Sequence, residues 1–262
     1  MSDAHPGQLI LDPPGDGAWN MAVDEALLHL AAEEGIATLR FYQWQEPTLS
    51  LGYFQQFSDR HQHPASLSAT VVRRQSGGGA ILHDQELTYS ISLPATHPFA
   101  KNAQSLYDSV HTILVSILKR HLSNASQIRL WEKAITLGED EPFLCFQRRA
   151  LGDIVLDTSL ATSQQVATHK IVGSAQRRNR GAVLQHGSIL LDNSPHSPEL
   201  PGVNDLCGST LSAIGLTEEL RDILPPALAL SCLHVEINRK VHTLAERWYN
   251  EKYGRAQWTT RR

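Results

Sequence analysis

The sequence predicts an α+β fold built on a mostly antiparallel or mixed sheet. Helix and strand patterns follow one another irregularly, without the repeated strand–helix–strand order that indicates a parallel sheet. The chain has 262 residues, 41% of them hydrophobic, which is enough to bury a large core in one domain or two smaller ones. No internal repeat or low-complexity linker divides it.

The first elements can be located from local signals. Residues 9–11 are apolar and form a short expected strand that stops at Asp12-Pro13-Pro14-Gly15. Asn20 is expected to cap the helix that follows, because acidic residues come early in that helix and apolar ones lie on its inward face. Residues 38–44 and 48–54 are expected to be strands, with a turn at Glu46 and Pro47 between them.

The clearest helix covers residues 104–121, where apolar side chains recur on one face. Ser105 and Asp108 resemble a capping box at its start. The polar segment 158–168 is expected to be a mobile hairpin tip. Further strands are predicted at residues 71–72, 87–93, 153–156, 170–176 and 187–191. Further helices are predicted near residues 217–224 and from residue 241 onward.

Composition excludes several classes of protein. The net charge of −4 gives no basic field for nucleic acid. Three cysteines do not form a disulfide framework and fit a reducing cytoplasm. The first seven residues lack the pattern of a signal peptide, and no run approaches the roughly 20 apolar residues of a membrane span. The 13 histidines are scattered, without zinc-ligand spacing. We therefore expect a cytoplasmic protein with no metal site.

A glycine turn is the most informative stretch. Arg73 and Arg74 lead through Ser76 into Gly77-Gly78-Gly79, and His83 follows before a strand. Glycines let the main chain approach a ligand closely, and guanidinium groups offer donors to a carboxylate or phosphate. A plain turn is the alternative, but it would not need the arginines or the histidine. The stretch matches neither the phosphate loop nor the dinucleotide fingerprint, so nucleotide binding does not follow from it.

Lys170 opens a second dense segment and is followed by the small residues Gly173, Ser174 and Ala175. These residues could form the base of a pocket in which the Lys170 amine donates a hydrogen bond or, if desolvated, acts as a base. A surface lysine at a strand start is the alternative. A solvated turn that could meet an acidic protein partner is expected from Arg177, Arg178 and Arg180.

Cys145 is the third feature and stands between Leu144 and Phe146. A cysteine among aromatic and apolar residues is usually a small buried hydrophobe. To act as a nucleophile its thiolate needs a stabilising neighbour, such as Lys170 or a histidine. Cys207 and Cys232 are expected to be structural.

Taken together, these blocks resemble the biotin/lipoate protein ligase superfamily, in its lipoate ligase and octanoyltransferase branch. The resemblance is spread over most of the chain and keeps the order of the blocks. It rests on residues 20–28, 40–44, 47–55, 73–80, 83–90, 170–176 and 185–191, with Lys252, Tyr253 and Trp258 near the end. It implies a mixed, mainly antiparallel sheet with flanking helices. It also implies a single catalytic domain over residues 1–262, without a C-terminal accessory domain.

In the family, the glycine loop and its arginine border an acyl tunnel, and the lysine contacts the activated acyl group. The resemblance thus implies a catalytic Lys170, together with the nucleophile Cys145 in the transferase branch. The substrate-binding residues that it implies are Arg74, Ser76, Gly77, Gly78, Gly79, His83, Gly173, Ser174 and Ala175. Leu82 and Tyr89 are weaker candidates for lining the tunnel.

Two activities fit this resemblance. A transferase takes octanoyl, or lipoyl, from acyl carrier protein through a cysteine thioester and needs no cofactor. The acceptor is a lysine of a lipoyl carrier domain, from glycine cleavage H protein or a 2-oxoacid dehydrogenase E2. A ligase instead activates free lipoate with ATP and Mg²⁺ as an acyl-adenylate. Cys145-Phe146 stands where the transferase branch carries a Cys-Phe pair, which favours the transferase.

Two departures from the branch lie beside Cys145. Residues 147–150 read Gln-Arg-Arg-Ala where transferases carry small and aromatic residues, and the hairpin between Val155 and Lys170 is longer than expected. If Cys145 is not catalytic, the ligase or an acyl relay between carrier domains becomes the better interpretation. A non-catalytic relative that only binds an acyl group or a carrier domain is a further alternative, although its mark would be a missing Lys170 or a broken glycine loop.

Overall fold

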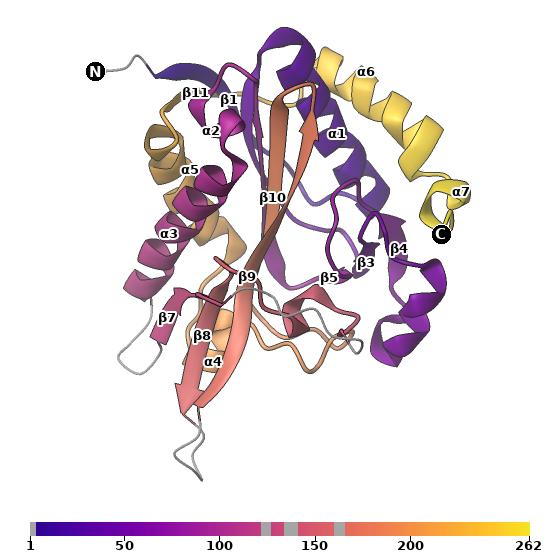
Figure 1. Ribbon diagram of the computed structural model, residues 1–262, viewed down its shortest axis with the longest axis vertical. Coiled ribbons are helices and arrows are strands. Elements are labelled where there is room, and N and C mark those ends of the chain that lie inside the picture. The colour runs from indigo at the N-terminus through magenta and orange to yellow at the C-terminus, as the bar shows by residue number, and fades with distance from the viewer. Residues whose placement is uncertain (1–3, 122–126, 134–140, 160–165) are drawn as a thin grey trace.

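The computed structural model describes residues 4–121, 127–133, 141–159 and 166–262. A large sheet of eight strands forms the centre, and a small sheet of three strands lies to one side of it (Figure 1). The order in the large sheet is β11-β1-β2-β6-β10-β9-β8-β7. Only the β11–β1 and β1–β2 pairs are parallel, and the others are antiparallel. The predicted α+β fold with a mixed, mainly antiparallel sheet is confirmed.

The large sheet draws its strands from the whole length of the chain. Its members are β1 His5–Leu11, β2 Ala37–Tyr42, β6 Glu86–Leu93, β7 Gln127–Leu130, β8 Ile154–Ser159, β9 Val166–Asn179, β10 Ala182–Leu190 and β11 Leu230–His234. The long β9–β10 hairpin runs through the middle of the molecule (Figure 1). Every residue of β6 and β10 is buried, because helices cover both faces of these central strands.

Helices lie on both sides of the large sheet (Figure 1). Leu106, Leu114 and Leu220 of α3 and α5 belong to the main apolar core on one side. Met21 and Val241 of α1 and α6 belong to a second cluster on the other side. The α-helices are α1 Gly17–Glu34, α2 Pro98–Lys101, α3 Ala103–His121, α4 Val203–Cys207, α5 Ala213–Ala227, α6 Arg239–Trp248 and α7 Ala256–Thr259. The 3₁₀ helices are η1 Phe57–Gln62, η2 Pro64–Ser66 and η3 Cys145–Gln147, and the π-helical turn η4 covers Tyr249–Tyr253.

The small sheet consists of β3 Thr48–Leu51, β4 Thr70–Arg73 and β5 Ile81–His83, with β3 in the middle. The two expected strands that flank Glu46 and Pro47 therefore belong to different sheets. The first pairs with β1 and β6, whereas the second pairs with β4 and β5. The small sheet is what carries the glycine loop, which connects β4 to β5.

Two predicted helix caps are wrong. Asp16, not Asn20, caps α1: its carboxylate accepts a hydrogen bond from the Trp19 amide at 2.9 Å. Asn20 is fully buried, and its side-chain oxygen accepts from Arg40 instead. At the start of α3 the Asn102 side chain accepts from the Ser105 amide at 3.2 Å, so the cap lies three residues earlier than expected.

The expected hairpin tip at residues 158–168 is described in part. Strands β8 and β9 pair as far as Ser159 and Val166. Residues 160–165, and with them most of the expected tip, lie outside the described residues.

Within the described ranges, no helix combines the length and the apolar composition that crossing a membrane requires. In the same ranges, no three His, Cys, Asp or Glu side chains are grouped so that they could hold a metal ion. Two deeply buried carboxylates are paired with cations instead: Asp24 with Arg40 at 2.9 Å, and Asp153 with Lys170 at 2.8 Å.

Candidate active site

Cys145 lies beside Lys170. The Nζ atom of Lys170 donates a hydrogen bond to Sγ of Cys145 over 3.6 Å. Cys145 is partly exposed at the start of η3, whereas Lys170 is buried in β9. A thiol that is open to solvent and faces a cation is the arrangement that activates cysteine nucleophiles, because the cation stabilises the thiolate.

A carboxylate holds Lys170 in place. Oδ2 of Asp153 lies 2.8 Å from Nζ of Lys170, and the Tyr107 hydroxyl donates to Oδ1 of the same carboxylate at 2.8 Å. Burial by itself would lower the pKa of Lys170, but the negative charges of the Cys145 thiolate and Asp153 outweigh it and raise this pKa above its ordinary value. Lys170 is therefore an ammonium ion at neutral pH, directed at the sulfur.

An irregular stretch of β9 lets the lysine turn into the site. Val155 pairs with Lys170 and the adjacent Ile154 with Val172, so β9 holds one extra residue there. The Lys170 side chain then crosses Gly173, where a Cβ atom would overlap Cε and lie 2.8 Å from Nζ. Gly173 is thus required by the close approach of the lysine side chain.

The glycine loop packs against the segment that carries Cys145. The Cys145 amide donates to the Ala80 carbonyl at 2.7 Å, and the Ala80 amide donates to the Phe143 carbonyl at 3.1 Å. A Cβ atom at Gly79 would lie 3.1 Å from the Cys145 nitrogen, which is too close for a comfortable contact. Gly78 adopts φ +93°, a conformation that favours glycine. The loop and the thiol therefore form one wall of the site.

The two arginines before the loop make hydrogen bonds to backbone carbonyls. The Arg74 guanidinium donates to the carbonyls of Gly77 and Gly79 at 2.8 and 2.7 Å. Arg73 donates to the carbonyls of Gly52, Gln55 and Thr259. Burial lowers the pKa of Arg74 to about 10, with the Cys145 charge acting in the opposite sense. Both side chains brace the backbone, and Arg74 fixes the shape of the glycine loop.

Two cavities lie beside the glycine loop. The first, of about 220 Å³, is lined by Gly78, Gly79, Gln104, Tyr107, Cys145, Arg148, Ala150, Leu151, Asp153, Lys170 and Ser174. The second is narrow and mostly apolar, and its lining is Met21, Tyr42, Trp44, Arg74, Ile81, His83, Thr88, Ala175, His186, Gly187 and Ser188. Gly79 borders the first cavity, and Arg74, which borders the second, donates to the Gly79 carbonyl at 2.7 Å, so the glycine loop lies beside both cavities.

His83 belongs to the wall of the narrow cavity. Its ring stacks on Trp44 with a centroid distance of 3.8 Å. Its two nitrogens lie 2.7 Å from Glu86 and 2.7 Å from Ser50. Burial, the largest influence, lowers the pKa of His83 below its ordinary value although Glu86 acts to raise it. The ring is therefore a fixed, largely neutral part of the wall at neutral pH.

The predicted site residues fall into three groups. Gly78, Gly79, Cys145, Lys170 and Ser174 line the first cavity, and Arg74, His83 and Ala175 line the second. The others lie beside the site: Gly77 next to Phe54, Gly173 beneath Lys170, and Ser76 with its hydroxyl 2.5 Å from Nε2 of His186.

The two weaker tunnel candidates lie elsewhere. Leu82 packs into the apolar cluster of the small sheet. The Tyr89 hydroxyl forms a hydrogen bond of 2.5 Å with the Ser174 hydroxyl. Both side chains occupy the space that a side chain at Gly187 would need. Met21 and Trp44 border the narrow cavity in their place.

Two residues that position Lys170, Asp153 and Tyr107, were not predicted from the sequence. Asp153 stands directly before the apolar strand Ile154–Leu156, where a carboxylate needs a buried partner. That is the one signal that could have singled it out. Tyr107 lies on the helix face that the periodicity predicts to be apolar, so its role depends on tertiary packing alone.

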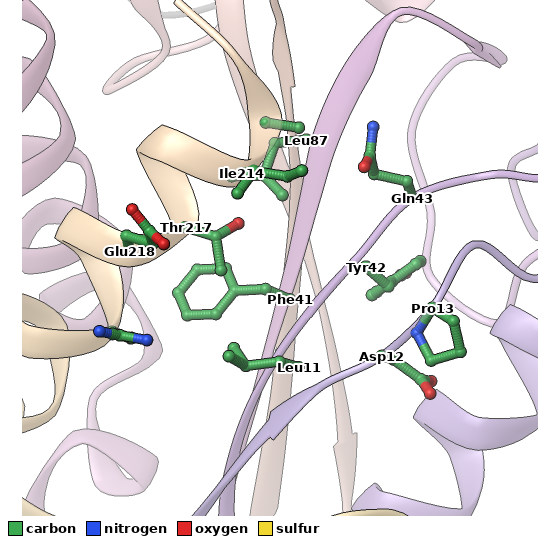
Figure 2. A pocket seen from close by; sticks show the side chains of 12 residues that line it. Leu11, Asp12, Pro13, Phe41, Tyr42, Gln43, Leu87, Ile214, Thr217 and Glu218 are labelled. Atoms are coloured by element: carbon green, nitrogen blue, oxygen red, sulfur yellow. The ribbon is translucent and has the colours of Figure 1, made fainter.

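A larger hollow of about 400 Å³ lies near the N-terminal end of α5; it shares Tyr42 with the narrow cavity but no residue with the Cys145 pocket. Figure 2 shows Leu11 and Phe41 opposite Ile214 and Thr217 in it. None of its twelve lining residues is a cysteine, lysine or histidine. In the sheet, β2 is separated from β9 by β6 and β10, so the hollow is remote from Cys145.

Comparison with known proteins identifies the family. Residues 16–204 match the lipoyl protein ligase A/B catalytic domain. The chain belongs to this family. It is 32% identical to octanoyltransferase LipM of Kyrpidia tusciae over 95% of this chain and 96% of that protein. It is 38% identical to octanoyltransferase LipM of Oceanobacillus iheyensis over 68% of this chain and 61% of that protein's length. The family resemblance predicted from the sequence is confirmed.

Solved structures share the fold of this family member. A bipartite lipoate protein ligase from Thermoplasma acidophilum, studied with its E2 lipoyl domain, has a TM-score of 0.71 at 20% identity and covers 98% of this chain and 96% of that one. A lipoate-protein ligase A bound with ATP has a TM-score of 0.64 at 20% identity and covers 97% of this chain and 98% of that one. At this identity the likeness concerns the fold alone, so it does not separate ligase from transferase.

Proposed function

We propose that this protein is an octanoyltransferase that works through a thioester on Cys145. It takes octanoyl from acyl carrier protein and passes it to a lysine of a lipoyl carrier domain. The observation that carries the proposal is the 3.6 Å approach of the Lys170 ammonium to the Cys145 sulfur at an accessible pocket. The relatives that match over most of the chain, named octanoyltransferase LipM, support it.

In the first step the Cys145 thiolate attacks the carbonyl carbon of the octanoyl thioester. A new C–S bond forms to Cys145, the C–S bond to the carrier breaks, and the carrier leaves as a thiolate that takes up a proton. One thioester replaces another, so the step is nearly balanced in energy and consumes no ATP. Lys170 stabilises the attacking anion and stays protonated because Asp153 holds it at 2.8 Å.

In the second step the ε-amine of the acceptor lysine attacks the Cys145 thioester. A C–N bond forms, the C–S bond breaks, and the amine gives a proton to the solvent. The Cys145 sulfur leaves as a thiolate beside the Lys170 ammonium, which favours its departure. The product is a stable amide, so the transfer is driven forward.

The narrow cavity suits the acyl tail. Met21, Trp44, Ile81 and Ala175 give it an apolar lining, and its Arg74 is hydrogen-bonded to Gly79 of the Cys145 pocket. Burying an alkyl tail stabilises the bound acyl group by about 0.8 kcal/mol per CH₂ group. Because the cavity is narrow, a chain that enters it displaces side chains from its wall.

A transfer assay without ATP tests the proposal. Purified protein is mixed with octanoyl-acyl carrier protein and a lipoyl domain of glycine cleavage H protein or of a 2-oxoacid dehydrogenase E2, and the acceptor is followed by intact mass. Octanoyl should appear on the acceptor lysine without added nucleotide. The competing function, an ATP- and Mg²⁺-dependent lipoate ligase, predicts lipoate-dependent ATP–pyrophosphate exchange instead, and that result would overturn the proposal.

A further inference from the structure

An arginine–aromatic surface lies beside the glycine loop. It consists of Tyr53, Phe54, Arg177, Arg261 and Arg262. The Phe54 side chain is 67% exposed, and its ring lies against that of Tyr53 with a centroid distance of 4.9 Å, so two aromatic rings lie together among the arginines. The Tyr53 amide donates to the carbonyl of Ser76 at 2.9 Å, so the surface is tied to the loop that borders the thiol.

Positive charge gathers on this surface although the whole chain is acidic. The guanidinium groups of Arg177, Arg261 and Arg262 lie 5.6, 3.9 and 5.9 Å from the Tyr53 ring centroid, and that of Arg262 lies 5.5 Å from the Phe54 ring. In the part of the chain that the structure describes, none of the three forms an ion pair with a carboxylate. Arginine and aromatic side chains are the groups most enriched at protein interfaces. Unpaired cations also steer an acidic partner toward the surface.

We propose that the arginine–aromatic surface docks the body of an acidic acyl carrier protein, the donor of the transfer. This inference rests on the proposed function and adds where the donor sits. The partner lays acidic side chains against Arg177 and Arg262 and packs an apolar patch on Phe54. Its prosthetic arm then passes the glycine loop and delivers the thioester to Cys145.

The position of the surface favours the donor over the acceptor. None of the residues that line the Cys145 pocket belongs to it. The glycine loop lies between the arginine–aromatic surface and the Cys145 pocket. Phe54 is the nearest neighbour of Gly77 on one side, and Cys145 contacts Gly79 on the other. A donor that carries its acyl group on a long flexible arm can dock on the far side of the glycine loop and still reach the thiol. A lysine amine stands on a stem of only four carbons, so the acceptor domain must cover the pocket mouth itself.

Charge reversal tests the docking site. The variant R177E/R262E is compared with R221E, which reverses an exposed arginine on α5 across the sheet. Acylation of Cys145 is measured with two donors, octanoyl-acyl carrier protein and the small thioester octanoyl-pantetheine. We expect R177E/R262E to slow acylation by the carrier protein about tenfold at low salt, with acylation by octanoyl-pantetheine unchanged, and R221E to alter neither.

Binding gives a second readout that is independent of chemistry. Titration of octanoyl-acyl carrier protein into Cys145→Ser protein should show an affinity that weakens with added salt and falls in the R177E/R262E background. Unchanged binding and unchanged acylation in that variant would overturn the inference, as would a defect confined to transfer onto the lipoyl domain. If neither donor acylates wild-type protein, the proposed function fails, whereas the titration still decides whether the carrier docks here.

Discussion

The ammonium group of Lys170 lies 3.6 Å from the sulfur of Cys145, although 25 positions separate the two residues in the chain. The pair arises because the glycine loop fixes the Cys145 segment and the bulge in β9 turns the lysine toward it. Asp153 then keeps the amine protonated. Each part of this arrangement predicts a separate, measurable effect.

Removing the charge of Lys170 should deactivate the thiol. In the double variant K170M/D153N the sulfur loses its cation, and no buried carboxylate is left unpaired. We expect alkylation of Cys145 by iodoacetamide at pH 7 to slow by about tenfold or more, since no cation faces the sulfur in this variant. K170R keeps a positive charge and should retain much of the reactivity. Equal alkylation rates in wild-type protein and the double variant would contradict a role for the cation.

Asp153→Asn should change the pH dependence of activity. Asp153 is one of the two negative groups that raise the pKa of Lys170, so its loss lowers that pKa and the ammonium is lost at lower pH. The alkaline limb of the pH–rate profile for Cys145 acylation should therefore move to lower pH. Tyr107→Phe removes only the hydrogen bond to Asp153 and should move the limb less. An alkaline limb that stays in place in Asp153→Asn would rule out this positioning role.

Two neighbouring glycines make a matched pair. A Cβ atom at Gly79 would press on the Cys145 nitrogen and the Phe143 carbonyl, both at 3.1 Å, whereas at Gly77 the nearest atom is 4.0 Å away. Gly79→Ala should therefore displace Cys145 and reduce acylation about tenfold or more, and Gly77→Ala should leave the rate nearly unchanged. The single-turnover rate with octanoyl-pantetheine measures both. A Gly77→Ala protein as slow as Gly79→Ala would show that the loop acts by flexibility, not by this contact.

Local sequence patterns predicted the elements but not their partners. The apolar face of residues 104–121 identified α3, and alternation identified β6, because these signals come from short-range periodicity. The pairing of β1 with β11 joins residues at opposite ends of the chain, such as His5 and Leu230, and no local pattern encodes it. The separation of β2 from β3 into two sheets has the same origin.

The site was predictable where the residue type itself indicates a chemical role. The glycine loop, Cys145 and Lys170 stood out for that reason, and the structure places them around one pocket. Asp153 was not predicted, because its importance comes from the tertiary contact with the amine. The hydrogen bonds of Arg74 to the carbonyls of Gly77 and Gly79 were not predicted either, because they depend on how the loop folds.

His111 should make stability sensitive to acid. Burial, the dominant cause, lowers its pKa from 6.5 to about 4, and its nitrogens meet the Gly152 carbonyl and the Ser174 hydroxyl. Between those pH values the unfolded chain binds a proton there that the folded protein does not, so the free energy of unfolding falls as pH is lowered. The loss from pH 7 to pH 5 is about 2 kcal/mol for this group.

Urea unfolding at the two pH values measures this effect. His111→Gln lacks the titrating ring, so its loss of stability between pH 7 and pH 5 should be smaller than that of wild-type protein by about the same 2 kcal/mol. The buried His83 titrates in both proteins and cancels in the comparison. Parallel losses in the two proteins would contradict a neutral, buried His111.

Detection of an octanoyl thioester on Cys145 tests the proposed nucleophile directly. Protein is incubated with octanoyl-acyl carrier protein in the absence of any acceptor and then examined by intact mass and peptide mapping. We expect one octanoyl group on Cys145, released by hydroxylamine and absent from Cys145→Ser. A folded wild-type protein that gains no octanoyl group, or gains it at another residue, would show that Cys145 is not the acyl carrier.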